Sequence, residues 1–328
     1  MYYKITPLDT LFFRGAEPME AGRLSVTPLF PPPLSVFYGA IRTTVLKQRN
    51  ISFTQYNENR APKEIAELIG ECGAETAPFN ITSVLLEYNN TLYAPAPFSW
   101  FIDSDKKPEK GADYLNHAVK KACNCSQKAL ERLKINASSS PLPLVPAVNE
   151  ALSLGGTWIR YEVLYKKGKI TLGKNDILLP NELYAIEQRT GISLLDENNR
   201  STRKVKDGAL FSAGHIRLKE GVFLIIGTDR ECGLAESGMI NLGGERRLCG
   251  YTRISLSLPR TDSSDFFMAL APVKATEENM DKCFCAGKPV VTAGWDLHKG
   301  FHKTSQSWFP AGSVFIENIN NQCVPLAQ

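Results

Sequence analysis

The sequence has no apolar run that is long enough to cross a bilayer. A membrane-spanning helix needs roughly 20 mainly apolar residues, whereas a run such as Val222–Ile226 is far shorter. Met1 is followed directly by Tyr2, Tyr3 and Lys4, without an apolar signal core. We therefore expect a cytoplasmic chain that is neither membrane-bound nor exported.

The sequence also has little excess of charge. Its 38 Lys and Arg residues against 34 Asp and Glu residues give a net charge of +4, so only the distribution of charge can indicate a partner. With 43% hydrophobic and 22% charged residues, the composition excludes a disordered chain, a collagen and a coiled coil. At roughly 150 residues per domain, the 328 residues favour two domains.

Assembled catalytic motifs are absent as well. The chain has no G-x-S-x-G, no H-E-x-x-H and no Walker-type sequence, and it has only four histidines. His215, near the basic Arg217, is a candidate general base on RNA, although a lone histidine in a strand is more often structural. The eight cysteines are scattered, and we expect reduced thiols that mostly behave as small buried apolar groups.

Several segments have the pattern of strands, hairpins or helices. The spacing of apolar residues predicts a helix that Ser35 caps and a short one between Pro62 and Gly70. It also predicts a long helix from Tyr114 to Leu133, followed by a linker over 138–146. Hairpins are predicted around Asn89-Asn90, around 166–168 and around 219–221. Many strands with few helices indicate an α+β protein with antiparallel sheets.

The segment Leu242–Arg247 combines two adjacent glycines with two arginines. Adjacent glycines let backbone N–H groups come close to a phosphate, and arginines add bidentate contacts. The alternative is an ordinary hairpin turn with solvated arginines. The segment alone leaves both interpretations open.

The run from Asn198 to Lys219 is rich in Lys and Arg, and the part before Gly208 has almost no apolar residues. This pattern predicts a mobile basic excursion before a strand at Leu210. Two interpretations of this segment stay open. It contacts a phosphate backbone, or it is a solvated loop without a function.

Two cysteines and two histidines near the C-terminus approximate a zinc pattern. Cys283 and Cys285 are separated by one residue, where two to four are usual, and they precede His298 and His302. Loop residues and core thiols are the favoured interpretation, so we expect no metal and no cofactor.

Together, six segments in one order resemble a known family. They are Thr6–Gly15, Leu29–Arg42, Glu187–Asp196, Leu242–Arg247, the stretch 294–300 (GWDLHKG) and Pro310–Phe315. In this order they are similar to the third-subunit family of the Cmr complex, the type III-B CRISPR effector, within the RAMP superfamily. The matches run from Thr6 to Phe315 and so cover nearly the whole chain.

The resemblance implies two ferredoxin-like (RRM-like) domains and no nuclease activity. We place these domains at 1–150 and 151–328, with a basic thumb-like hairpin and a glycine-rich loop in the second. The resemblance also implies the partners of the chain. They are the 5′ tag of the CRISPR RNA, the large Cas ten subunit, the backbone subunit Cmr four and other Cmr subunits, and a membrane is not among them. The residues expected to contact RNA are Arg14, Arg42, Arg189, Arg203, Lys204, Lys206, Gly243, Gly244, Glu245, Arg246 and Arg247.

We therefore interpret the sequence as that of a non-catalytic, RNA-binding subunit of a type III-B effector. Two alternatives stay open at this point. One is a RAMP endoribonuclease that matures CRISPR RNA with a histidine general base. The other is an assembly protein that contacts only other subunits.

Overall fold

The computed structural model describes most of the chain. The described residues are 1–13, 28–74, 76–133, 141–144, 149–197, 200–259, 264–293, 295–296, 301–319 and 321–326. No helix in these ranges is long and apolar enough to span a membrane.

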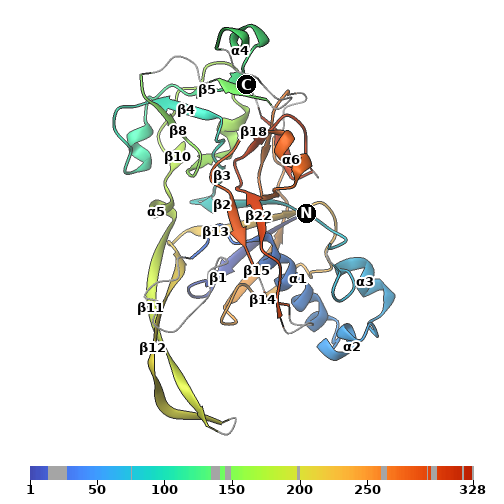
Figure 1. Cartoon of the computed structure of the whole chain (residues 1–328). Coiled ribbons are helices and arrows are strands. Elements are labelled where there is room, and N and C mark those ends of the chain that lie inside the picture. Colours follow the sequence, from blue (N-terminus) through green and yellow to red (C-terminus); the bar gives the residue numbers. More distant parts are fainter. Residues whose placement is uncertain are drawn as a thin grey trace.

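An eight-stranded sheet lies at the centre of the molecule (Figure 1), and all its neighbouring strands are antiparallel. In spatial order the strands are β10 (Ile177–Leu178), β9 (Trp158–Arg160), β3 (Thr91–Pro95), β2 (Ile81–Tyr88), β13 (Val222–Thr228), β1 (Tyr2–Pro7), β15 (Leu248–Ile254) and β14 (Ser237–Asn241). The predicted combination of α and β elements with antiparallel sheets is confirmed. Strands from both sides of residue 150 share this sheet, and a division into two ferredoxin-like domains stays a prediction.

Successive side chains of a strand point to opposite faces of the sheet, and both faces of the central sheet are buried. On β2, Val84 and Leu86 contribute to one core, whereas Leu85 between them contributes to another. The first core includes Phe37 and Ile41 of α1 (Leu34–Gln48), and the short helices α2 (Phe53–Asn57) and α3 (Lys63–Ile69) add to the same layer. The second core includes residues from the C-terminal part of the chain, such as Met268 and Leu270.

The remaining elements form small sheets and short helical segments. The sheets are β5-β4-β8, β6-β7, β18-β23-β16-β24, β17-β22-β19 and β20-β21, besides the hairpin β11-β12 described below. Their strands are β4 (Trp100–Asp103), β5 (Lys120–Lys121), β6 (Cys123–Asn124), β7 (Pro143–Leu144), β8 (Ala151–Ser153), β16 (Phe267–Ala269), β17 (Val273–Lys274), β18 (Cys283–Cys285), β19 (Val290–Thr292), β20 (Trp295–Asp296), β21 (Phe301–His302), β22 (Gln306–Phe309), β23 (Val314–Phe315) and β24 (Cys323–Pro325). The helical segments are η1 (Gly111–Tyr114), η2 (Tyr161–Tyr165), α4 (Gln127–Leu133), α5 (Pro180–Leu183) and α6 (Glu277–Asp281).

The predicted helices on the core side and the Asn89-Asn90 hairpin are confirmed. Asn89 and Asn90 have φ values of 49° and 60°, which lets β2 turn directly into β3. The helix α3 ends at Gly70, as predicted. The cap of α1 differs, because the helix begins at Leu34 and Pro33 occupies the N-cap position without a side-chain hydrogen bond.

The predicted long helix from Tyr114 to Leu133 is wrong. Only its last part is helical, as α4, and Asn116 has a φ of 67°, which a continuous helix does not allow. The backbone beyond it instead pairs with β4, since Trp100 lies opposite Lys121, and the N–H of Ala122 donates to the carbonyl of Ser99. Tertiary contacts override the helical spacing here. The predicted linker at 138–146 lies mostly outside the described residues.

Two predicted hairpins also differ from the structure. Before Lys166 the chain forms the 3-10 turn η2. The strand before this turn, β9, pairs with β3 and β10 and not with residues 169–172, so the expected hairpin does not form. At Lys219–Gly221 the flanking segments are strands, as predicted, but they do not pair. The preceding strand belongs to β11-β12, whereas β13 joins the central sheet.

Candidate nucleic-acid interface

A long two-stranded hairpin projects from the central sheet (Figure 1). We call it the thumb: β11 (Tyr184–Glu197) pairs antiparallel with β12 (Arg200–Leu218), and Tyr184 lies opposite Leu218 at its base. A thumb-like hairpin was expected here, but the strand expected from Leu210 already begins at Arg200, so the basic residues lie within β12. Cross-strand pairs such as Leu194 with Val205 hold the distal part in the ladder.

The basic residues of the distal thumb lie on β12. Lys204 is exposed, while the side chains of Arg203 and Lys206 lie outside the described part of the structure. One apolar pair faces solvent nearby: Ile192 lies opposite Leu210, and each is about half exposed. The thumb therefore presents both a cationic and an apolar group to its surroundings.

Three arginines meet one carboxylate where the thumb joins the sheet. The carboxylate of Asp9, just after β1, accepts from Arg247 at 2.9 Å, from Arg217 at 3.2 Å and from Arg189 at 3.4 Å. Arg189 comes from β11, Arg217 from β12, and Arg247 from the turn that joins β14 to β15. Segments that are far apart in the sequence thus bring three guanidinium groups to one point.

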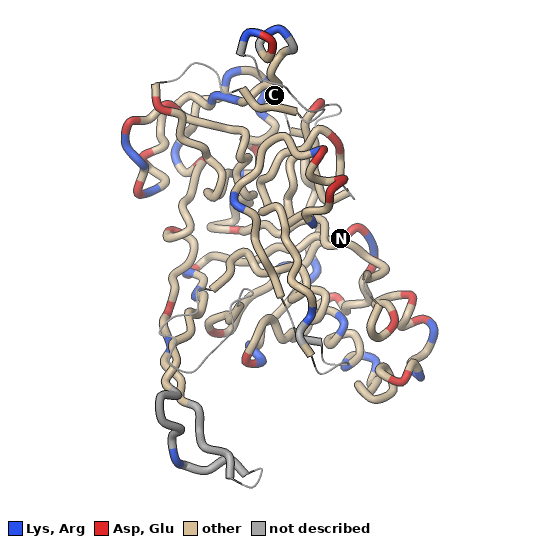
Figure 2. Tube along the Cα trace, in the orientation of Figure 1, with Lys and Arg blue, Asp and Glu red and all other residues tan. Residues whose placement is uncertain are grey.

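Two further carboxylates balance these arginines. Glu187 lies 2.8 Å from Arg189 and 2.7 Å from Arg217, and Glu245 lies 2.5 Å from Arg247. We call Asp9, Glu187, Arg189, Arg217, Glu245 and Arg247 the thumb-base cluster. In Figure 2, blue and red segments lie next to each other around this region.

The environment keeps two carboxylates of the thumb-base cluster ionised. Hydrogen bonds from Arg217 and Arg189 lower the pKa of Glu187. The backbone N–H of Thr10 and the neighbouring Arg189 lower the pKa of Asp9. The cluster pairs three arginines with three carboxylates, and a phosphate that binds there must compete with Asp9.

The glycine-rich turn 242–247 packs against the segment after β1. Gly243 has a φ of 83°, and a Cβ atom at this position would lie 2.5 Å from the carbonyl oxygen of Phe12. The N–H of Gly244 donates to the same carbonyl at 2.9 Å. These glycines thus allow close packing within the chain and present Arg246 and Arg247 beside the thumb. Direct contact between the glycines and a phosphate stays a prediction.

Three further arginines were expected to contact RNA, and none of them belongs to the thumb-base cluster. Arg246 is exposed and its side chain has no partner among the described residues. Arg42 lies on α1, away from the thumb, where its guanidinium donates to the carbonyls of Ile69 and Thr76. Its visible role is to cap the end of α3. Arg14 lies outside the described residues.

His215 lies beneath the thumb-base cluster and is only 1% exposed. Its ring stacks on Phe12 with centroids 4.9 Å apart, and Nδ1 lies 3.3 Å from the Thr10 hydroxyl. Burial lowers its pKa. A general base must reach the proton that it removes, and the burial of this ring favours a structural role.

The cysteine and histidine pattern near the C-terminus can be followed only in part. Cys283 and Cys285 lie on β18, and burial raises the pKa of both thiols, to about 12 for Cys283. His298 and the side chain of His302 lie outside the described residues. All eight cysteines are described, and none forms a disulfide. The absence of a metal thus stays a prediction.

Sequence analysis missed three residues of the thumb-base cluster. Asp9, Glu187 and Arg217 were not among the expected site residues. A usable signal was present, since Glu187 and Arg189 are two residues apart on β11 and therefore share one face of the thumb. Asp9 gave no such signal, because only the fold brings it to this point.

Comparison with known proteins gives a family and a fold. The family model for CRISPR-associated protein (Cas_Cmr3) matches residues 3–264. A curated relative, the CRISPR system CMR subunit Cmr3 from Saccharolobus solfataricus, is 24% identical over 136 residues. That match covers 41% of this chain and only 39% of the relative.

Two solved structures share the fold over most of the chain. One is a chain in the cryo-EM structure of the type III-B Cmr-beta bound to cognate target RNA and AMPPnP, with a TM-score of 0.54 and 17% identity. The other is a chain in the Cmr-beta bound to cognate target RNA, with a TM-score of 0.51 and 16% identity. Each match covers 96% of this chain and 86% of the other.

Proposed function

The chain belongs to the Cmr3 family of CRISPR-associated proteins, and from this premise we propose that it is a non-catalytic subunit of a type III-B CRISPR effector. In this proposal it is cytoplasmic and binds the 5′ tag of the CRISPR RNA. It also docks on the large Cas ten subunit and the backbone subunit Cmr four. The similar fold of chains in the type III-B Cmr-beta supports the proposal.

The observation that carries RNA binding is the convergence of Arg189, Arg217 and Arg247 on the exposed carboxylate of Asp9. Guanidinium groups bind phosphate through paired, charge-assisted hydrogen bonds. A phosphate at the position of Asp9 would meet donors from three different segments. Arg246, which has no described partner, adds a contact beside them, and Lys204 extends the path along the thumb.

The apolar pair Ile192 and Leu210 on the thumb suits the bases of the RNA, whereas the arginines suit its phosphates. Single-stranded RNA is bound by cations at its phosphates and by apolar or aromatic groups at its bases. Ile192 and Leu210 offer such an apolar platform, and each is about half exposed. We propose that the thumb contacts bases and that the thumb-base cluster contacts phosphates.

A histidine-dependent RAMP endoribonuclease is the alternative function. Nε2 of His215 lies 3.8 Å from a carboxylate oxygen of Glu245 in the thumb-base cluster, but the burial of the ring and its stacking on Phe12 disfavour direct access to RNA. Incubation of the chain with repeat RNA in the absence of metal discriminates between the two functions. Cleavage that His215→Gln abolishes would favour the enzyme.

Binding of tag-containing RNA by an Arg217→Ala variant tests the proposed function. Each phosphate contact that is lost should reduce the slope of log affinity against log salt by about one. Arg253→Ala is the matched control, because Arg253 is also half-buried and pairs with Glu231 and Glu236 outside the cluster. Equal slopes for both variants would contradict the proposal.

A further inference from the structure

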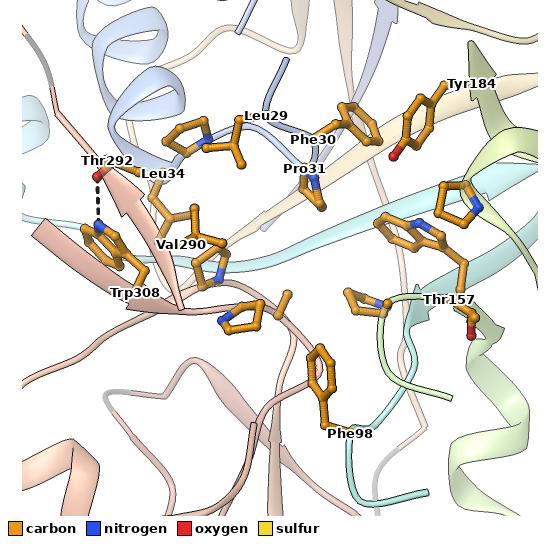
Figure 3. Close-up of a pocket in the computed structure, with 18 of the residues that line it drawn as sticks. Leu29, Phe30, Pro31, Leu34, Phe98, Thr157, Tyr184, Val290, Thr292 and Trp308 are labelled. Carbon is orange, nitrogen blue, oxygen red and sulfur yellow. Dashed lines mark hydrogen bonds between the residues drawn. The ribbon is translucent and has the colours of Figure 1, made fainter. Parts of the chain in front are cut away.

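Figure 3 shows an apolar pocket whose lining includes no residue of the thumb-base cluster. It has a volume of about 180 Å³, and its lining includes the segment before α1, the start of the thumb, strands β19 and β22, and residues of β3 and β9. Among the residues that the structure describes, its walls contain six prolines and five aromatic residues, and none of these lining residues is charged. The pocket therefore does not suit a phosphate-bearing ligand.

Three of the six polar side chains that line this pocket among the described residues have hydrogen-bond partners there. The indole N–H of Trp308 donates to the hydroxyl of Thr292 at 2.9 Å, and the hydroxyl of Thr157 donates to the carbonyl of Leu154. The Tyr184 hydroxyl is one of the other three, with the Ser35 hydroxyl and the Trp158 indole N–H. It makes no hydrogen bond to any residue that the structure describes, and it points toward the pocket in Figure 3. Its ring is held against Phe30, with centroids 4.5 Å apart.

One wall of the pocket lies beyond the residues that the family model matches. The family model ends at residue 264, whereas Val290, Thr292 and Trp308 come from β19 and β22.

We propose that the pocket receives one large aromatic side chain of a neighbouring protein subunit. A cavity of about 150 Å³ holds a benzene ring, so this volume suits a Phe, Tyr or Trp side chain. Buried aromatic side chains in such pockets are the usual anchors of protein interfaces. The free Tyr184 hydroxyl supplies a hydrogen bond to the anchor or to its backbone. This inference rests on the proposed function, because it requires that the chain assembles with other subunits.

Filling the pocket is the first test. In Val290→Phe the added ring occupies the pocket, whereas the neighbouring Val291→Phe places the same ring on the opposite face of β19, where Val291 is 46% exposed. In a complex reconstituted from all its subunits, Val290→Phe should weaken binding of this chain by roughly 30-fold, as the loss of an anchor does. Val291→Phe should not. Equal affinities of the two variants would overturn the proposal.

Photo-crosslinking is the second test and does not depend on filling the pocket. Benzoylphenylalanine replaces Ser35, an exposed residue at the rim, in the assembled complex. We expect a crosslink to a peptide of another protein subunit that contains an aromatic residue. A crosslink to RNA, a crosslink only within this chain, or none at all would each overturn the proposal. RNA binding by Val290→Phe is measured in parallel, so that failure of the anchor and failure of the RNA site are distinguished.

Discussion

Replacing Asp9 by Asn tests whether the thumb-base cluster is an RNA site that this carboxylate masks. The wild-type cluster has three arginines and three carboxylates, so its net charge is zero. Asp9→Asn keeps the shape of the side chain but leaves a net charge of +1. It also removes the anion that competes with a phosphate for Arg189, Arg217 and Arg247.

The size of the effect follows from distance and exposure. Two unit charges about 4 Å apart interact by roughly 1 kcal/mol in water and by about 4 kcal/mol in a partly buried site. Asp9 is 47% exposed, so we take the lower value, which corresponds to a gain of about five-fold in affinity. Salt screens exposed charges, and the gain should shrink as the ionic strength rises.

Fluorescence anisotropy with a short tag-containing RNA, at two salt concentrations, measures this gain. Glu71→Gln is the control, because it removes the same charge from an exposed residue in the segment after α3. Only Asp9→Asn should raise the affinity. A lower or unchanged affinity, with an unchanged melting temperature, would refute the idea that Asp9 competes with phosphate.

Four other predictions follow from the same structure. Gly243→Ala should lower the free energy of unfolding by about 1–3 kcal/mol, because φ is positive and a Cβ would collide with the facing carbonyl; a urea titration that matches wild type would contradict this. Arg246→Ala should reduce the salt slope of RNA binding by about one without changing the melting temperature, since its side chain has no described partner to lose. Burial lowers the pKa of His215 below its ordinary value of 6.5, so the unfolded chain binds the proton more readily and stability should fall as the pH drops below 6.5; His215→Gln should weaken this dependence in urea titrations at pH 7.5 and 5.5. Chelation by EDTA should leave the melting temperature unchanged and elemental analysis should find little zinc, whereas one zinc per chain after dialysis would contradict the expected absence of a metal.

Local signals predicted those elements whose contacts are local. The Asn89-Asn90 turn follows from residues that tolerate positive φ, and α1 follows from the spacing of its apolar residues. The predicted helix from Tyr114 failed because the backbone around Lys121 pairs with β4, a strand some 20 residues earlier in the chain. A helical spacing of small apolar residues did not reveal that long-range pairing.

In the candidate site, too, the residues that could be predicted are those with a local signal in the sequence. Arg189 and Arg247 could be found from the sequence, because each belongs to a segment that resembles the family. Asp9 belongs to such a segment too, yet its role depends on contacts with residues 180 to 238 positions away. The burial of His215 could not be inferred either, since Phe12 covers it only in the folded chain.

A cryo-EM map of the effector reconstituted with this chain and a tag-containing CRISPR RNA tests the central claim most directly. We predict that a phosphate of the tag lies within hydrogen-bond distance of at least two of Arg189, Arg217 and Arg247, with the Asp9 carboxylate displaced from them. A map in which Asp9 still bridges the three arginines, and the tag runs over another surface, would contradict the account.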